Sequence, residues 1–132
     1  MAIVKRGLPA KMAAAIQEEC HDIAHELPVR HFHAPGTYTR ELSVPAGVLL
    51  VGKKHRHSHV NIISKGRAEV YCEELGVFLV EAPCTFVSAP GTQRVIHALE
   101  DLVWITVHAT HSTDLLEIER EVIVQDCLED LT

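Results

Sequence analysis

The sequence predicts a mainly β domain of antiparallel strands, arranged as a sandwich or barrel, with a helix at each end. From residue 37 to residue 109 the chain consists of short runs rich in apolar and β-branched residues, separated by turn residues. No helical periodicity interrupts these runs, and short strands that follow one another this closely pair with antiparallel neighbours. The length of 132 residues corresponds to a single domain.

The first element is a helix expected over residues 9–26. Pro9 suits the first turn of a helix, and Pro28 ends it. His31 and His33 follow shortly before another proline, and we expect them in an exposed loop. Apolar side chains recur within the helix at the spacing of one face: Met12, Ala15, Ile16, Cys20, Ile23 and Ala24.

The β-rich part is followed by a second helix, which begins with a capping sequence. Ser112 or Thr113 would be the N-cap, and Asp114 would lie near the positive end of the helix dipole. We expect strands near residues 37–42, 46–53, 55–64, 67–73, 76–82, 84–88, 94–99 and 102–109. The chain thus divides into a helical segment (1–30), a β domain (37–109) and a helix (112–131).

Bulk properties exclude several classes of protein. A formal net charge of −6 argues against a nucleic-acid-binding protein, which is normally basic. No apolar run is long enough to cross a membrane, and the N-terminus lacks the apolar core of a signal peptide. The four cysteines form no Cys-x-x-Cys pair, so we expect them to be reduced and the protein to be cytoplasmic.

The run His-Arg-His-Ser-His-Val-Asn at residues 55–61 is the strongest chemical signal. In an extended chain, His55, His57, His59 and Asn61 would share one face. Imidazole is a common ligand of Fe, Zn, Ni and Mn, so this face predicts a site for a divalent transition metal. The alternative is a polar strand edge that faces solvent.

Strand geometry limits how many of these histidines one ion can bind. Side chains on one face of a strand are about 7 Å apart, so an ion would take two neighbours and need a ligand from another strand. His97 and His108 are the candidates for that ligand. His108 ends an apolar strand and either faces a pocket or caps the strand, whereas His97 would also suit a partly exposed strand.

Three further residues are candidates for binding a substrate. Arg94 could hold a carboxylate or phosphate through its planar fork, or form a salt bridge with a nearby acidic residue. Asn61 could donate a hydrogen bond to a ligand, although polar residues are common at strand edges. Tyr71 would line the pocket if its strand alternates with Glu69 as expected.

Residues 37–109 resemble the cupin family. A glycine-flanked histidine strand, the turn glycine Gly66, and a second strand entered through Pro90-Gly91 match the order of the two cupin motifs. In the family pattern, a His-x-His pair and a glutamate precede a glycine, and a histidine follows the second motif's Pro-x-Gly. Here His59 stands at the glutamate position, His55 at the second histidine, and Arg94 at the second motif's histidine.

This resemblance implies a small antiparallel jelly-roll barrel, often dimeric, with a pocket inside. The altered motif leaves two alternatives. Either a metal binds through a set drawn from His55, His57, His59, His97 and His108, or metal binding is lost and a basic pocket holds an anion.

The leading functional prediction is a metalloprotein that binds a small, anionic molecule, as a dioxygenase, isomerase or lyase. No nucleophile–base pair specifies the reaction, so the catalytic residues are not predicted. The alternative is a β-barrel without enzymatic activity or metal, serving in binding or assembly, as some phage-encoded accessory proteins do. We also expect a homodimer, because the apolar stripe of the C-terminal helix could pack across an interface; the alternative is that this stripe packs onto its own barrel.

Overall fold

The computed structural model describes residues 27–72 and 75–124. The strands of this part of the chain are β1 (Val29–Ala34), β2 (Thr37–Val44), β3 (Leu49–Val51), β4 (His59–Lys65), β5 (Arg67–Cys72), β6 (Gly76–Glu81), β7 (Cys84–Ser88), β8 (Arg94–Ala98) and β9 (Leu102–Ala109), and they are followed by helix α2 (Leu115–Val122). The helix expected over residues 9–26 lies outside the described residues.

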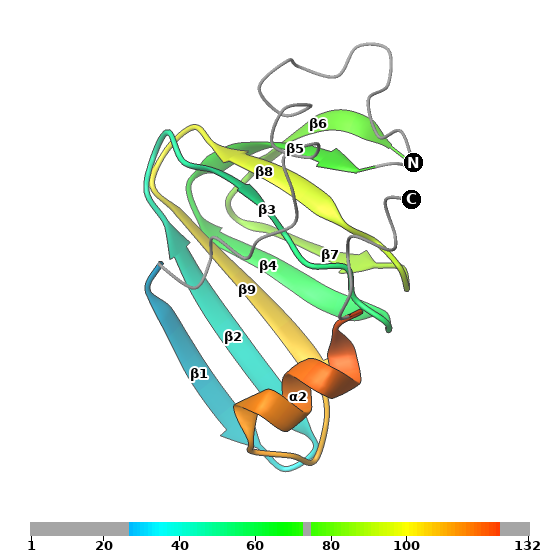
Figure 1. Cartoon of the computed structure of the whole chain (residues 1–132). Helices are drawn as coiled ribbons and strands as arrows, with labels where there is room; N and C mark the ends of the chain where they lie inside the picture. Colours follow the sequence, from blue (N-terminus) through cyan, green and yellow to red (C-terminus); the bar gives the residue numbers. More distant parts are fainter. Residues whose placement is uncertain (1–26, 73–74, 125–132) are drawn as a thin grey trace.

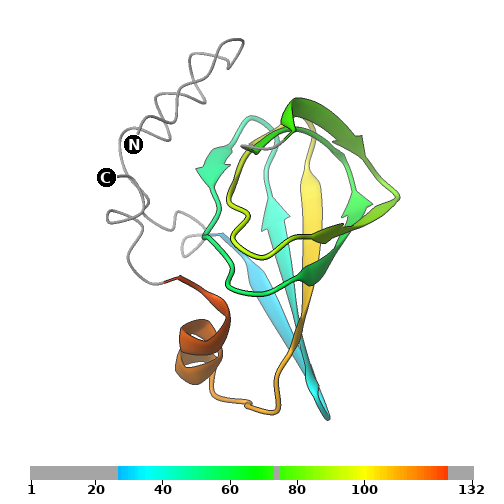
Figure 2. The ribbon, with the colours of Figure 1, turned by 90° about the vertical axis from the view of Figure 1, so that its right-hand side faces the viewer.

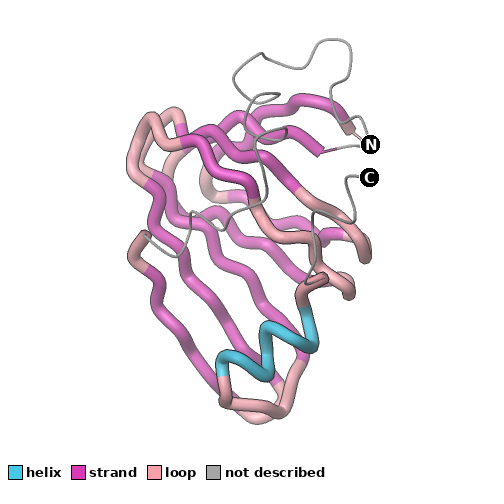
Figure 3. The backbone as a smooth tube through the Cα atoms, viewed as in Figure 1, coloured by secondary structure: helices cyan, strands magenta, loops and turns pink. Residues whose placement is uncertain are grey.

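The strands form two antiparallel sheets that face each other (Figure 1). The larger sheet has the order β1-β2-β9-β4-β7, and the smaller one has the order β3-β8-β5-β6. The prediction of a mainly β, antiparallel domain is therefore confirmed. The barrel is not closed, because the described strands hydrogen-bond as two separate sheets. Figure 3 shows how strands make up most of the described backbone.

The core fills the space between the sheets and follows from strand alternation. Leu42 and Val44 point inward from β2, and Val70 and Ile96 meet them from the smaller sheet. Trp104 on β9 is 5% exposed and packs edge-on against a phenylalanine of β7. This core occupies one end of the molecule, and the larger sheet continues beyond it (Figure 2).

Helix α2 covers the part of the larger sheet that the smaller sheet leaves open (Figure 2). Its buried side chains Ile118 and Val122 pack with Tyr38 of β2 in a second cluster.

The N-cap of helix α2 is Asp114, whose carboxylate accepts a hydrogen bond from the backbone N–H of Leu116 at 3.0 Å. The prediction of Ser112 or Thr113 as N-cap is therefore wrong. Neither of these two hydroxyl residues directly precedes the first helical turn at Leu115.

Two further expectations about local structure are corrected. Residues 29–34 form strand β1 and not a loop; almost all of its side chains are exposed, so no apolar alternation marks it in the sequence. The strand expected at residues 55–64 begins only at His59, because residues 56–58 turn away from the sheet. In residues 27–72 and 75–124, no helix is long and apolar enough to cross a membrane.

Candidate metal and small-molecule site

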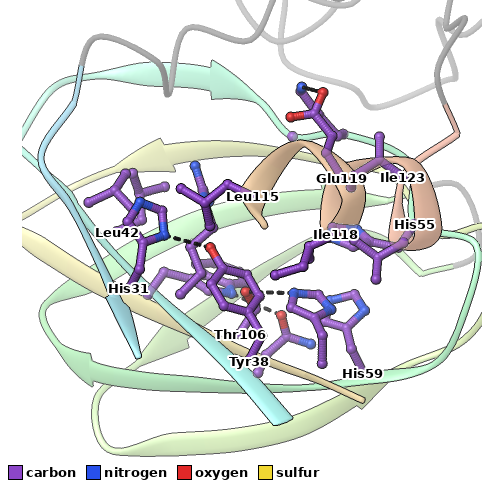
Figure 4. A pocket seen from close by; sticks show the side chains of 18 of the residues that line it. His31, Tyr38, Leu42, His55, His59, Thr106, Leu115, Ile118, Glu119 and Ile123 are labelled. Carbon is purple, nitrogen blue, oxygen red and sulfur yellow. Dashed lines mark hydrogen bonds and ion pairs between the residues drawn. The ribbon is translucent and has the colours of Figure 1, made fainter. Parts of the chain in front are cut away.

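A cavity of about 520 Å³ lies between the inner face of the larger sheet, strand β8 and helix α2 (Figure 4). A volume in this range suits a small molecule. Apolar residues of the strands and the preceding segment, Leu27, Val29, Leu42, Leu50 and Ile96, form part of the wall. Apolar side chains of α2, polar rings and two arginines also line the cavity.

Three histidines, His55, His59 and His108, converge on the polar part of this cavity, and we call them the histidine cluster. The ring centroids of His55 and His59 lie 4.1 Å apart, and those of His59 and His108 lie 5.0 Å apart. Each ring offers one nitrogen such that the three atoms all lie within 4.8 Å of one another. Two nitrogens bound to one ion are at most about 4.2 Å apart, so small side-chain rotations would bring all three into coordination.

Hydrogen bonds of the backbone hold His55 in place from two sides. Its carbonyl accepts a hydrogen bond of 2.7 Å from the N–H of Gly91, in the turn before β8. On the other side, His55 forms a β-bridge with Ile123, at the end of α2. The other two histidines lie on strands, His59 at the start of β4 and His108 near the end of β9. The site thus joins β4, β9 and the end of α2.

Burial keeps the cluster in the neutral form that binds metals. It lowers the pKa of His55 to about 3, and the neighbouring charges of His59, His108, Arg40 and Arg94 act in the same direction. Burial, followed by His59 and Arg40, lowers the pKa of His108 to about 4. The pKa of His59 is also lowered, mainly by burial. Neutral imidazoles have a free nitrogen lone pair, so each ring can act as a ligand at neutral pH.

The burial of one nitrogen atom of the cluster is not explained by contacts within the protein. Nδ1 of His59 is buried and has no hydrogen-bond partner among the described residues. Such atoms are rare in folded proteins, and an ion is one of the groups that satisfy them. By contrast, Nε2 of His108 lies 3.0 Å from Oγ1 of Thr106, a contact that helps to fix the orientation of the ring. The donor set, its neutral state and the unpartnered nitrogen fit a transition metal.

The other two predicted ligands lie elsewhere. His57 is exposed and does not join the cluster, because residues 56–58 bend and do not continue the strand. His97, on β8, does not line the cavity, and its Nδ1 lies 3.3 Å from a carboxylate oxygen of Glu69. The expectation that His57 shares a face with His55 and His59 is therefore wrong.

The predicted substrate-binding residues have different surroundings. Arg94 lines the cavity, donates a hydrogen bond to the hydroxyl of Ser88, and lies over the ring of Phe86. Asn61 also lines the cavity, but its amide is hydrogen-bonded to protein groups at both ends. Tyr71 is 3% exposed, packs with Val95 and is absent from the cavity wall.

The structure adds cavity residues that the sequence did not indicate. Arg40 points inward from β2, between its strand partners Thr106 and His31. Tyr38, two residues earlier on the same face, has its hydroxyl 2.7 Å from Nδ1 of His31. Burial raises the pKa of Tyr38 and, with Arg40, lowers that of His31, so both groups are neutral at pH 7, and the tautomer of His31 decides which of the two donates. Only the alternation along β2 could have indicated these residues in the sequence.

No family model matches the chain, and no curated protein matches it. Similar solved structures exist. KdgF from Halomonas sp. has a TM-score of 0.57 and 18% identity, over 76% of this chain and 94% of that one. An RmlC-like cupin from Methanocaldococcus jannaschii has a TM-score of 0.55 and 15% identity, over 64% of this chain and 81% of that one.

A third similar structure is a cupin 2 domain-containing protein from Halorhodospira halophila. Its TM-score is 0.54 at 20% identity, and the match covers 80% of this chain and 79% of that one. Identities this low show the fold alone. Two facing antiparallel sheets with a cavity between them agree with that likeness. The chain therefore has the cupin-like double-stranded β-helix fold.

Proposed function

We propose that this protein is a metal-dependent enzyme that binds a small anionic molecule in the cavity. The observation that carries the proposal is the histidine cluster, in which three nitrogens, one from each ring, lie within 4.8 Å of one another. When bound there, Fe would supply dioxygen activation, and Zn, Ni or Mn would act as a Lewis acid for an isomerase or lyase reaction.

The chain's own residues would bind and orient the substrate. The apolar wall beside Leu42 and Ile96 would take a hydrocarbon portion and exclude water. Tyr38 and His31 share a proton between the phenol oxygen and Nδ1, and His31 is exposed, so this proton can be exchanged with solvent. The similarity to KdgF supports the cupin fold of the domain that surrounds the cavity.

The experiment is metal analysis of the purified protein and of matched histidine variants. The wild type should hold about one equivalent of Fe, Zn, Ni or Mn. His59→Ala and His108→Ala should each reduce metal occupancy at least about tenfold, because each removes a ligand. His57→Ala and His97→Ala are the controls, since each removes a histidine outside the cluster, and they should retain the metal.

Two results would overturn the proposal. One is a wild-type protein that is purified without metal and binds neither added Zn²⁺ nor Fe²⁺ in a titration. The other is equal metal binding by the cluster variants and the controls. Either result would favour the alternative of a β-domain without enzymatic activity, serving in binding or assembly. If the alanine variants fold poorly, His59→Gln and His108→Gln keep the side chain polar and provide the same comparison.

A further inference from the structure

Arg40 is a cavity-lining cation that pairs with no carboxylate among the described residues. In residues 27–72 and 75–124, its side chain makes no ion pair and no hydrogen bond with another side chain. The neighbouring acid on β2, Glu41, faces the opposite side of the sheet and pairs with Arg30 at 2.6 Å. A partly buried guanidinium without a carboxylate partner is solvated by water, and an anionic ligand can take the place of that water.

The surroundings of Arg40 add no compensating charge. Among the described residues that line the cavity, Glu119 is the only carboxylate, and it pairs with Lys53 at 3.0 Å. The side chains nearest to Arg40 across the sheet are Thr106 and His31, which are neutral when the histidine is unprotonated. The cavity is therefore electropositive on the side where β2 meets β9.

Arg40 is connected to the histidine cluster through its neighbour on β9. Its strand partner Thr106 contacts His108 at 3.0 Å, and its charge acts on His55 and His108 alike. A ligand held by Arg40 would therefore lie beside the cluster. Its remainder would extend towards the apolar wall, which begins with Leu42, the next inward residue on β2.

We propose that Arg40 binds the carboxylate of a small carboxylic acid, whose apolar portion lies against Leu42, Leu50 and Ile96. A single planar guanidinium matches a carboxylate, with two parallel hydrogen bonds and one unit of charge. A phosphate would call for a second cation or a set of backbone N–H donors. The other cations of the wall are already engaged, since Arg94 is held by Ser88 and Phe86 and Lys53 pairs with Glu119. This inference rests on the proposed function, since it names the substrate class of the same cavity.

Arg94 is less suited to this role. Its guanidinium already donates to Ser88 and lies over Phe86, 5.1 Å from the ring centroid. These contacts fix its orientation as part of the wall. Arg40 has no such constraint from side chains of the described residues, so a ligand can orient it.

The test is calorimetric titration of the metal-free protein with hexanoate, with its neutral analogue hexanamide, and with inorganic phosphate. The wild type should bind hexanoate at least about tenfold more tightly than hexanamide, because only the acid forms a charge-assisted pair. Arg40→Gln should abolish this preference, and Arg40→Lys should restore part of it. Arg67→Gln is the matched control, because Arg67 pairs with Glu100 outside the cavity and its loss should leave hexanoate binding unchanged.

Measuring the metal content of the variants distinguishes a failure of this inference from a failure of the proposed function. Arg40→Gln should retain wild-type metal occupancy, and metal-free His108→Ala should still prefer hexanoate to hexanamide. Tighter binding of phosphate than of hexanoate, or an unchanged preference in Arg40→Gln, would overturn the role of Arg40 and leave the metal site intact. Conversely, if neither the wild type nor the variants hold metal, but the wild type still prefers hexanoate to hexanamide, only the metal site is overturned. Thermal unfolding of Arg40→Gln verifies that the variant is folded, and Arg40→Met serves as a second neutral variant.

Discussion

Nε1 of Trp104 donates a hydrogen bond of 2.9 Å to Oδ1 of Asn61, and both residues are buried between the sheets. The amide nitrogen of Asn61 in turn donates to the hydroxyl of Ser88 at 2.7 Å. The hydroxyl also accepts from Arg94, so a continuous polar network connects β9, β4, β7 and β8. This network orients the arginine in the cavity wall.

Asn61→Ala is expected to destabilise the fold by about 1–3 kcal/mol, because it leaves the buried indole N–H without a partner and removes one of the two hydrogen bonds to the Ser88 hydroxyl. Urea unfolding monitored by tryptophan fluorescence measures this change. Ser64→Ala is the control on the same strand, since Ser64 is exposed and should change stability by less than about 0.5 kcal/mol. Equal stability of the two variants would show that the network contributes little.

Gly66 connects β4 to β5 with a backbone φ of +88°, in close contact with another loop. A Cβ atom at this position would lie 2.2 Å from the carbonyl oxygen of Asp101. Gly66→Ala should therefore destabilise the protein by at least about 3 kcal/mol, from left-handed strain and from the clash together.

Gly76→Ala provides the matched control for this effect. Gly76 also has a positive φ, of +72°, but a Cβ there meets nothing within 4 Å. Its replacement should cost only the conformational strain, about 1–2 kcal/mol. Urea unfolding of both variants gives the difference, and similar losses would mean that the contact with Asp101 relaxes easily.

Much of the fold could be predicted from the sequence. Turn residues and β-branched runs indicated most of the strands, because their side chains alternate between a core and solvent. Strand β1 could not be predicted, because it lies at the sheet edge and nearly all of its side chains are exposed. A strand without a buried face shows no alternation of apolar and polar residues in the sequence. The N-cap at Asp114 was misplaced because three residues in a row could cap a helix, and only packing against β2 selects one.

The candidate site was predicted only in part. Histidines were expected to converge from residues 55–59 and from a second strand, and the structure brings together His55, His59 and His108. The bend at residues 56–58, which excludes His57, depends on contacts with the end of α2 that lie far away in sequence. Arg40 was not singled out, because an arginine between Tyr38 and Leu42 is also compatible with an exposed position.

The attachment of helix α2 to the sheet is expected to depend on its buried side chains, of which Ile118 is the most buried. Ile118 is 2% exposed and packs against Tyr38, whereas Leu116 on the same helix is 68% exposed. Ile118→Ala should destabilise the protein by about 2–4 kcal/mol, and Leu116→Ala by much less. Because the end of α2 forms a bridge with His55, the first variant should also bind Zn²⁺ more weakly. Urea unfolding and Zn²⁺ titration of both variants measure the two effects. Unchanged Zn²⁺ affinity in Ile118→Ala would show that metal binding does not depend on the attachment of the helix.

The metal-free protein should lose stability as the pH falls below about 6.5. The pKa of His55 is lowered to about 3 and that of His108 to about 4, whereas in the unfolded chain both have the ordinary value of about 6.5. Below pH 6.5 the unfolded state therefore takes up protons that the folded state does not bind. Each of these histidines lowers the free energy of unfolding by about 1.4 kcal/mol per pH unit, until its folded pKa is reached.

The histidine contribution is isolated by comparing variants, since carboxylates elsewhere titrate in the wild type and in the variants alike. Urea unfolding between pH 7.5 and 5 should show a smaller pH dependence for His108→Gln than for the wild type, by about 1.4 kcal/mol per pH unit below pH 6. His57→Gln, a replacement at an exposed position, should leave the slope unchanged. A His108→Gln slope equal to that of the wild type would mean that His108 has the same pKa in the folded and the unfolded protein. In that case protons would compete with a metal for its nitrogen below about pH 6.5.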